Sequence, residues 1–228
     1  MKKGGYVIPT KQTYNELQEA YDYFNIRLFN GELPNCLLTL QRKSGRVYGF
    51  FAPERFSNAV GNSKTDELAM NPMHFHKRSI EDVLSTLAHE MVHVWQAHYG
   101  KPGRRGYHNK EWGRKMMQIG LLPSNTGKPG GKTTGEQMSH YIESNGLFDS
   151  VGKGFLARGF RLSWAEGGQE IEPETTTIEV GKKNKPQNKS NRYKYTCIKC
   201  RNNAWGKLNL KIFCGVCMQP YYCENLEA

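Results

Sequence analysis

Residues 79–99 read Ser-Ile-Glu-Asp-Val-Leu-Ser-Thr-Leu-Ala-His-Glu-Met-Val-His-Val-Trp-Gln-Ala-His-Tyr, and this stretch decides the fold. Ser79 is a favoured residue for capping the start of a helix. Glu81 and Asp82 follow in the first turn, where carboxylates complement the helix dipole. A Gly-Lys-Pro-Gly run begins at Gly100 and interrupts the pattern. The stretch therefore predicts an amphipathic helix that ends at about residue 99.

The predicted helix carries a metal-binding motif. His89 and His93 are four residues apart, so both imidazoles can reach one ion. Glu90 lies beside the first ligand and can hold or deprotonate a water. A catalytic zinc needs a third protein ligand and an open fourth position. His108 follows a loop rich in Gly, Pro and Arg that can fold back onto the helix, just before a predicted helix at 109–119. His108 is therefore a candidate for the third ligand, beside the interpretation that it is one of several histidines with no metal role.

The other histidines are weaker candidates. His74 and His76 alternate beside a strand-like segment, which favours surface or turn positions. His98 is nine residues from the first ligand, which places it on the opposite face of the helix. His140 stays open, either as a group behind the ligands or as one that contacts substrate.

The first thirty residues predict a helix with one apolar face. The apolar residues, three or four apart, are Tyr14, Leu17, Tyr21, Phe24 and Leu28. Thr10 or Thr13 is the expected cap, and Asn30-Gly31 is the expected stop. Two strand-like runs follow at 37–41 and 46–52, and they predict a hairpin around 42–45. A short strand is expected at 67–70. This mixture of elements predicts an α+β domain.

The cysteines predict a second metal site. Five of the six cysteines fall in the last 32 residues. Two C-x-x-C pairs, Cys197/Cys200 and Cys214/Cys217, have the spacing of a closed, structural zinc site, as in zinc ribbons. Cys223 is expected to be spare. We therefore expect two zinc ions, one catalytic and one structural, and expect the second to contribute most of the ribbon's folding free energy.

The charge of the chain is uneven. Residues 1–100 carry 11 Lys and Arg against 10 Asp and Glu, whereas 101–132 carry 8 against 1 and 182–228 carry 10 against 2. Two basic blocks indicate a polyanionic partner. We expect this partner to be DNA, either single-stranded or bound without sequence preference. A solvated basic face without a partner is the alternative. The candidate contacts are Lys194, Lys199, Arg201, Trp205, Lys207, Lys211, Arg104 and Arg105, cations and one aromatic side chain suited to phosphates and bases.

Several motifs together resemble the SprT-like family of metallopeptidases. They are His89-Glu90-Met91-Val92-His93, His108, Trp112 and Met116 before 119–121, the helix exit at 28–34, and the strand at 67–72. The resemblance covers residues from about 13 to 122. It implies a zincin-like SprT metallopeptidase domain in which His89, His93 and His108 bind zinc and Glu90 is the catalytic base. It also implies protein substrates that are bound or crosslinked to DNA, and a small C-terminal zinc-ribbon domain.

The expected organisation is a metallopeptidase domain at 1–164, a linker at 165–192 and a zinc ribbon at 193–228. Residues 133–164 are expected to extend the catalytic domain, with Trp164 as a buried anchor. No apolar run is long enough to span a bilayer, and no apolar segment follows the basic start of the chain. We therefore expect a cytoplasmic protein with no membrane partner, associated with the nucleoid if the source is bacterial.

Two other functions stay open. One is a non-catalytic, zinc-containing protein that binds DNA or has a regulatory role. The presence of Glu90 argues against it, because a structural metal site has no need of a base. The other is a peptidase that acts without DNA and uses the ribbon to dock a protein. Tyr107, His140 and Tyr141 are candidates for stabilising the oxyanion of a tetrahedral intermediate, on the chemistry of their side chains alone.

Overall fold

The computed structural model describes residues 7–43, 47–166 and 193–223. The chain divides into two compact units, Met1–Glu172 and Pro173–Ala228, and each is described by itself. Apart from its first two residues, the expected linker at 165–192 lies outside the described residues, as do the last five residues of the expected ribbon. The domain limits therefore stay predictions.

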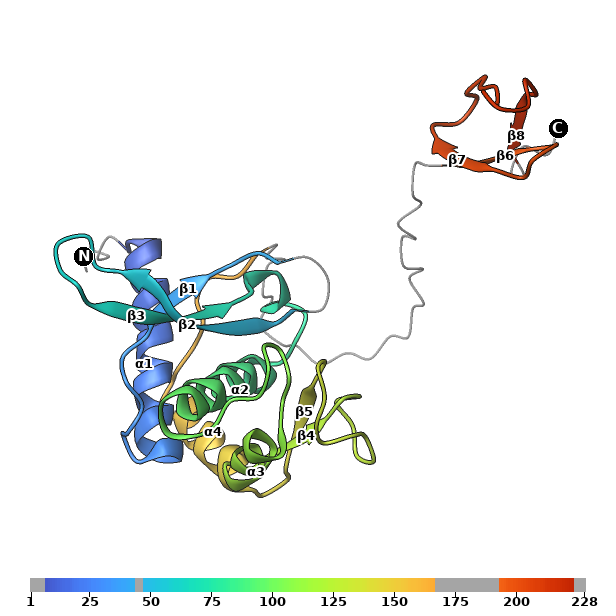
Figure 1. The fold of residues 1–228 in the computed structure, drawn as a ribbon. Helices are drawn as coiled ribbons and strands as arrows, with labels where there is room; N and C mark the ends of the chain where they lie inside the picture. The colour runs from blue at the N-terminus through green and yellow to red at the C-terminus, as the bar shows by residue number, and fades with distance from the viewer. Residues whose placement is uncertain (1–6, 44–46, 167–192, 224–228) are drawn as a thin grey trace, which may run out of the picture. The chain divides into compact units, whose positions relative to one another are not determined.

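Helix α1 (Pro9–Phe29) crosses one side of the first unit (Figure 1). The expected threonine cap is wrong. Pro9 occupies the first turn, where its fixed φ and missing N–H suit a helix start, and the preceding residue is Ile8. The Thr13 hydroxyl donates to the Pro9 carbonyl within the helix. The stop is as predicted, because Asn30 adopts a left-handed φ of 57°.

The sheet of the first unit contains β1 (Leu37–Leu40), β2 (Gly49–Ser57) and β3 (Lys64–Met70) in the order β1-β3-β2. Strand β1 is parallel to β3, and β2 is antiparallel to it. The predicted hairpin is wrong, because β3 lies between its two strands. The last five residues of β3 are all buried, which suits a central strand, whereas the sequence between β1 and β2 carries no information about the strand that separates them.

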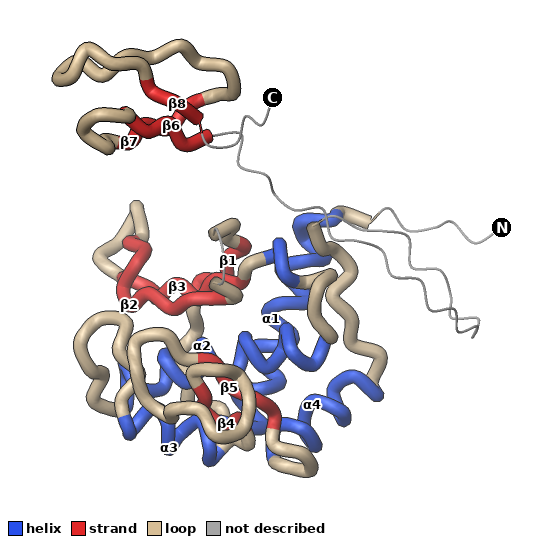
Figure 2. The backbone as a smooth tube through the Cα atoms, turned by 90° about the vertical axis from the view of Figure 1, so that its right-hand side faces the viewer, coloured by secondary structure: helices blue, strands red, loops and turns tan. Residues whose placement is uncertain are grey.

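Three further helices lie on one side of this sheet (Figures 1 and 2). Helix α2 (Ile80–Tyr99) packs against β2 and β3, and a 3-10 turn at Pro72–His74 precedes it. Helix α3 (Lys110–Gln118) is followed by the antiparallel pair β4 (Leu121–Ser124) and β5 (Ser139–Ile142). The predicted bounds of α2 and its Ser79 cap are confirmed.

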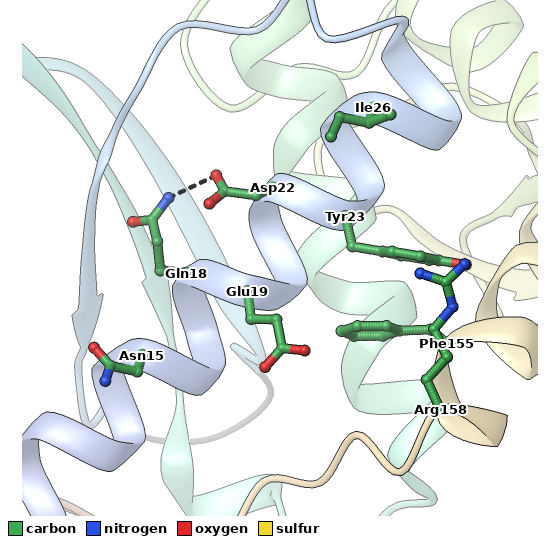
Figure 3. Close-up of a pocket in the computed structure, with 8 residues that line it drawn as sticks. All are labelled: Asn15, Gln18, Glu19, Asp22, Tyr23, Ile26, Phe155 and Arg158. Atoms are coloured by element: carbon green, nitrogen blue, oxygen red, sulfur yellow. Dashed lines mark hydrogen bonds between the residues drawn. The ribbon is translucent and has the colours of Figure 1, made fainter.

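Helix α4 (Leu147–Ala157) joins residues 133–164 to the core. Phe155 stacks on Tyr23 of α1 with ring centroids 4.3 Å apart, beside Arg158 (Figure 3). Trp164 is not a buried anchor: 47% of it is exposed, and its indole N–H donates to the Gln12 amide oxygen at 3.0 Å. That hydrogen bond satisfies the indole at the surface, so the large ring does not require burial.

The second unit is a small sheet with β6 (Tyr193–Cys197) between β7 (Asn203–Gly206) and β8 (Tyr221–Cys223). Its buried described residues are Tyr195, Thr196, Cys197 and Cys214. The chain is thus an α+β protein with a small C-terminal unit of the zinc-ribbon type. Within the described ranges, no helix has the length and apolar character needed to cross a membrane.

Candidate metal centres

Helix α2 fixes two of the three candidate histidine ligands. The Ser79 hydroxyl accepts from the Asp82 backbone N–H at 3.1 Å and caps the helix. His89 and Glu90 are buried, and His93 is partly buried one turn further on. Because most of α2 is enclosed by the core, these side chains stand on a rigid support.

The third histidine is held by the joint between α2 and α3. The Asn109 side chain caps α3 by accepting from the Trp112 N–H at 3.0 Å. The Gln96 amide of α2 donates to Asn109 and to the Glu111 carboxylate, at 2.8 Å in each case. These bonds bring the start of α3 against the end of α2, so His108 is turned back towards the other two ligands.

The three histidines converge on one point. His89, His93 and His108 each offer a ring nitrogen, and these atoms lie within 4.8 Å of one another. Nε2 of His93 and Nε2 of His108 are 3.1 Å apart. Nδ1 of His108 lies 3.2 Å from the Gly135 carbonyl oxygen, which can only accept, so Nδ1 carries the hydrogen. Nε2 of His108 is therefore unprotonated, and its lone pair is available to a metal. This donor set fits an imidazole-bound metal such as zinc.

Burial sets the charges in this cluster. Burial lowers the pKa of His89 well below its ordinary value, and the nearby His140, His93 and His108 lower it further. Burial also lowers the pKa of His93 to about 3. The imidazoles are therefore neutral at pH 7, the form that binds metals. Burial also raises the pKa of Glu90 to about 8. A divalent cation beside Glu90 would oppose that effect and favour the carboxylate.

Trp112 closes the inner side of the cluster. Its ring centroid lies 5.0 Å from that of His89, 5.6 Å from His93 and 4.4 Å from His108, and the residue is fully buried. The indole therefore restricts all three imidazole rings. Its spacing from His108 contributed to the family resemblance, but no signal in the sequence marked this packing role.

A cleft of about 1460 Å³ opens over the cluster, between β2 and α2. A Cβ at Gly49 would lie 3.0 Å from the Ala69 carbonyl oxygen and 3.1 Å from Cγ of Glu90. Glycine at this position thus lets β2 approach the helix directly above the acid. Tyr107 and His140 are among the residues that line the cleft, whereas Tyr141 is not.

The remaining candidates are placed as follows. Arg104 and Arg105 line the same cleft, and Arg104 pairs with Glu136 at 2.6 Å. His98 bonds to Asp66 at 2.7 Å and is not part of the cluster. His140, whose role the sequence left open, lies next to the ligand group: its Nδ1 lies 3.1 Å from Nδ1 of His89. The two residues are 51 positions apart, so only the fold brings them together.

The second cluster consists of Cys197, Cys200, Cys214 and Cys217, whose sulfurs lie within 4.8 Å of one another. Backbone N–H groups of the following residues donate to the first thiol of each pair. They lower the pKa of Cys197, through Cys200 and Lys199, and of Cys214, through Cys217 and Val216. Such N–H groups favour thiolates, the form that binds metal. Cys223 lies outside this group.

The surface of the second unit is basic. Its predicted DNA contacts Lys194, Lys199, Arg201, Trp205, Lys207 and Lys211 are all exposed. In the described part of this unit none of the five cations forms an ion pair. Lys194 and Trp205 occupy directly opposed positions on β6 and β7, so a cation and an exposed aromatic ring stand side by side.

This fold and its three-histidine centre define a metallopeptidase-like protein. The chain belongs to the SprT-like family, whose model matches residues 17–129. It is also similar to a relative described as an uncharacterized protein in the mucB 3′ region of Salmonella typhimurium. The two are 49% identical over 61 residues, which make up 27% of this chain and 81% of that relative. No solved structure gives a significant match.

Proposed function

We propose that this protein is a zinc-dependent metallopeptidase that hydrolyses peptide bonds in proteins bound or crosslinked to DNA. One observation carries the peptidase activity. Three neutral imidazoles converge at the floor of a cleft, and the acid Glu90 directly follows the first of them, His89, on α2. A purely structural site would gain nothing from a buried glutamate beside its ligand, because an unpaired buried acid costs folding free energy.

Each residue of the centre has a defined role in this proposal. His89, His93 and His108 would hold zinc, which supplies Lewis acidity for polarising a carbonyl and acidifying a water. Glu90 would be the base that orients the attacking water, takes its proton and passes it to the leaving amine. Gly49 keeps the space above Glu90 open. Tyr107 lines the cleft and offers a hydroxyl for the oxyanion.

The cleft suits an extended peptide. Strand β2 is at the edge of its sheet, and residues from Tyr48 to Pro53 line the cleft. A peptide laid along this edge in extended conformation can bond to its unpaired backbone groups. Such binding reads the main chain more than the side chains, which favours a peptidase that acts on many proteins.

We further propose that the second unit, with its four cysteines bound to a structural zinc, recruits the enzyme to single-stranded DNA. Its unpaired cations would contact phosphates, and the exposed ring of Trp205 would stack on a base beside Lys194. Arg104 and Arg105 would add contacts near the cleft. Four thiolates remain metal ligands in a reducing compartment, which supports the cytoplasmic location.

A second candidate rests on the apolar side chains around the cysteine pairs. Phe213 is 68% exposed, Val216 82% and Met218 75%. Side chains of this kind are also suited to docking a protein. In that case the ribbon would select a protein partner, and cleavage would proceed without DNA.

Cleavage of a DNA-binding protein by the zinc-loaded chain, with and without single-stranded DNA, tests these proposals. Glu90→Gln serves as the variant that keeps the ligands and loses the base. Cleavage that needs both Glu90 and DNA supports the full proposal. Equal cleavage without DNA favours the docking role. Zinc and DNA binding without any cleavage would favour the non-catalytic alternative.

A further inference from the structure

His140 approaches the centre from β5, outside the segment that matches the family model. Its Nδ1 faces Nδ1 of His89 at 3.1 Å, and its Nε2 faces the Ser85 hydroxyl oxygen at 2.8 Å. Ser85 lies on α2, one turn before His89. His140 thus bridges two positions of the helix that carries the ligands.

The hydrogens of the Ser85–His140–His89 chain follow once the Ser85 hydroxyl is taken to donate to a carbonyl oxygen, which can only accept. The Ser85 hydroxyl donates its only hydrogen to the Asp82 carbonyl oxygen at 2.9 Å. With the hydroxyl hydrogen in that bond, the Ser85 oxygen accepts from His140, which places a hydrogen on Nε2 of His140 and leaves Nδ1 as an acceptor. His89 then donates from Nδ1, and its Nε2 is left bare.

The same result holds for the other side of the centre. Nδ1 of His108 donates to the Gly135 carbonyl, and its Nε2 is bare. In His89 and His108, therefore, the ring nitrogen that faces away from the metal site, Nδ1, is hydrogen-bonded to a residue beyond position 129. Outer partners of this kind fix the ring and its tautomer in metal sites.

We infer that Ser85 and His140 are positioning residues, which hold His89 in the tautomer and orientation that leave its Nε2 free for the metal. His140 is not itself part of the ligand group, which within the described residues comprises His89, His93 and His108. The opposite arrangement, with the His140 hydrogen on Nδ1, would force a hydrogen onto Nε2 of His89 and abolish metal binding there. This inference rests on the metal of the proposed function and is independent of peptide hydrolysis.

The test uses the full chain with ¹⁵N-labelled histidine rings, titrated with Zn²⁺. Long-range proton–nitrogen NMR spectra report the tautomer of each ring, and they distinguish the histidine centre from the cysteines. Competition with a chelator, followed on the same signals, gives the affinity. The variants are His140→Ala, Ser85→Ala and His140→Asn, whose Oδ1 can replace Nδ1 as the acceptor. His76→Ala, at an exposed histidine, is the matched control.

In the zinc-bound wild type we expect His89 to carry its hydrogen on Nδ1 and His140 on Nε2. His140→Ala is expected to weaken zinc binding by roughly 10- to 100-fold, as for other outer-shell partners. Asn at this position is expected to restore most of the affinity, which a mere packing role would not allow. Amide spectra check that β4 and β5 remain paired in each variant.

Three results would overturn the inference: an affinity of His140→Ala equal to that of His76→Ala, a hydrogen on Nε2 of His89 in the zinc-bound state, or a metal-induced shift that makes His140 a ligand. Failure of the proposed function looks different. Zinc bound in the assigned tautomers, with the expected loss in His140→Ala but no cleavage of any protein by the wild type, would overturn the peptidase and support the positioning role.

Discussion

The two candidate metal centres differ in what holds their ligands in place. The histidines stand on α2 and at the start of α3, where the core of the first unit encloses them. The cysteines lie on two short turns of a unit with four buried described residues. The first site is preformed by the packing around it, whereas the second would depend largely on a bound metal to keep its ligands together.

The number of ligands differs as well, and it agrees with this division. Four thiolates would complete a tetrahedral zinc site, which would leave no position for a substrate. Three imidazoles would leave a fourth zinc position open, and the cleft lies over these imidazoles. Under the proposed function, the fold would support the histidine site, whereas the cysteine site, once it binds zinc, would support the fold.

The largest expected effect is that of metal removal, to which the two centres should respond in opposite ways. Removing metal with a chelator should unfold β6–β8, because the remaining core is too small to fold alone, and should leave the helices of the first unit intact. Backbone amide spectra of the full chain follow both units at once. Cys214→Ser should have the same effect as the chelator, and Cys223→Ser, outside the cluster, should have none. A ribbon that keeps its dispersed spectrum without metal contradicts this view.

The next effect concerns catalysis. Glu90→Gln should lower the cleavage rate by roughly 100- to 10000-fold, the contribution of a general base, while zinc stays bound to the three histidines. Turnover and metal content of the same preparation provide the measurement. Glu81→Gln, on the first turn of the same helix, is the matched control and should retain full activity. Equal activity in the two variants would remove Glu90 from the mechanism.

A smaller effect is expected at the close approach of β2 to α2. Gly49→Val should destabilise the first unit by about 3 kcal/mol and lower activity, because its side chain meets the Ala69 carbonyl and the Glu90 side chain. Gly61→Ala is the control, since a Cβ there meets nothing within 4 Å. Thermal unfolding and turnover distinguish the two variants. Full activity of Gly49→Val would show that this approach does not limit the site.

The smallest effect belongs to the surface of the ribbon. Trp205→Ala should weaken binding of single-stranded DNA by about 1–3 kcal/mol, the range for one base stacked on an aromatic ring. Lys194→Ala should lower the slope of log affinity against log salt by about 0.7. Fluorescence anisotropy with an oligonucleotide measures both. Trp164→Ala, at a half-exposed indole of the other unit, should leave affinity unchanged. Unchanged affinity in Trp205→Ala would favour the protein-docking role.

Much of the helical structure was predictable, because its signals are local. Ser79, the carboxylates that follow it and Gly100 lie within the helix or next to it, and the bounds of α2 matched the prediction. The start of α1 was missed because Pro9 outweighed the nearby threonines as a helix-start signal. The family and the mixed fold also followed from the sequence.

The pairing of the strands and the contacts between residues far apart in the chain were not predictable in the same way. The order β1-β3-β2 depends on contacts between distant residues, so adjacent strand-like runs were joined into a hairpin that does not exist. The exposure of Trp164 depends on Gln12 at the other end of the unit. Likewise, nothing near His140 in the chain indicates that it faces His89.

The bond between His108 and Gly135 has a consequence for the order of events during synthesis. The ribosome makes all three histidines before it makes the carbonyl that orients one of them, because Gly135 follows His108 in the chain. Domains generally fold from the N-terminal side as they emerge. A nascent chain that has exposed its three histidines therefore still lacks the carbonyl that gives His108 its final geometry. Metal captured before β4 and β5 emerge would be held more loosely than in the finished protein, so completion of the centre is a late step in its biogenesis.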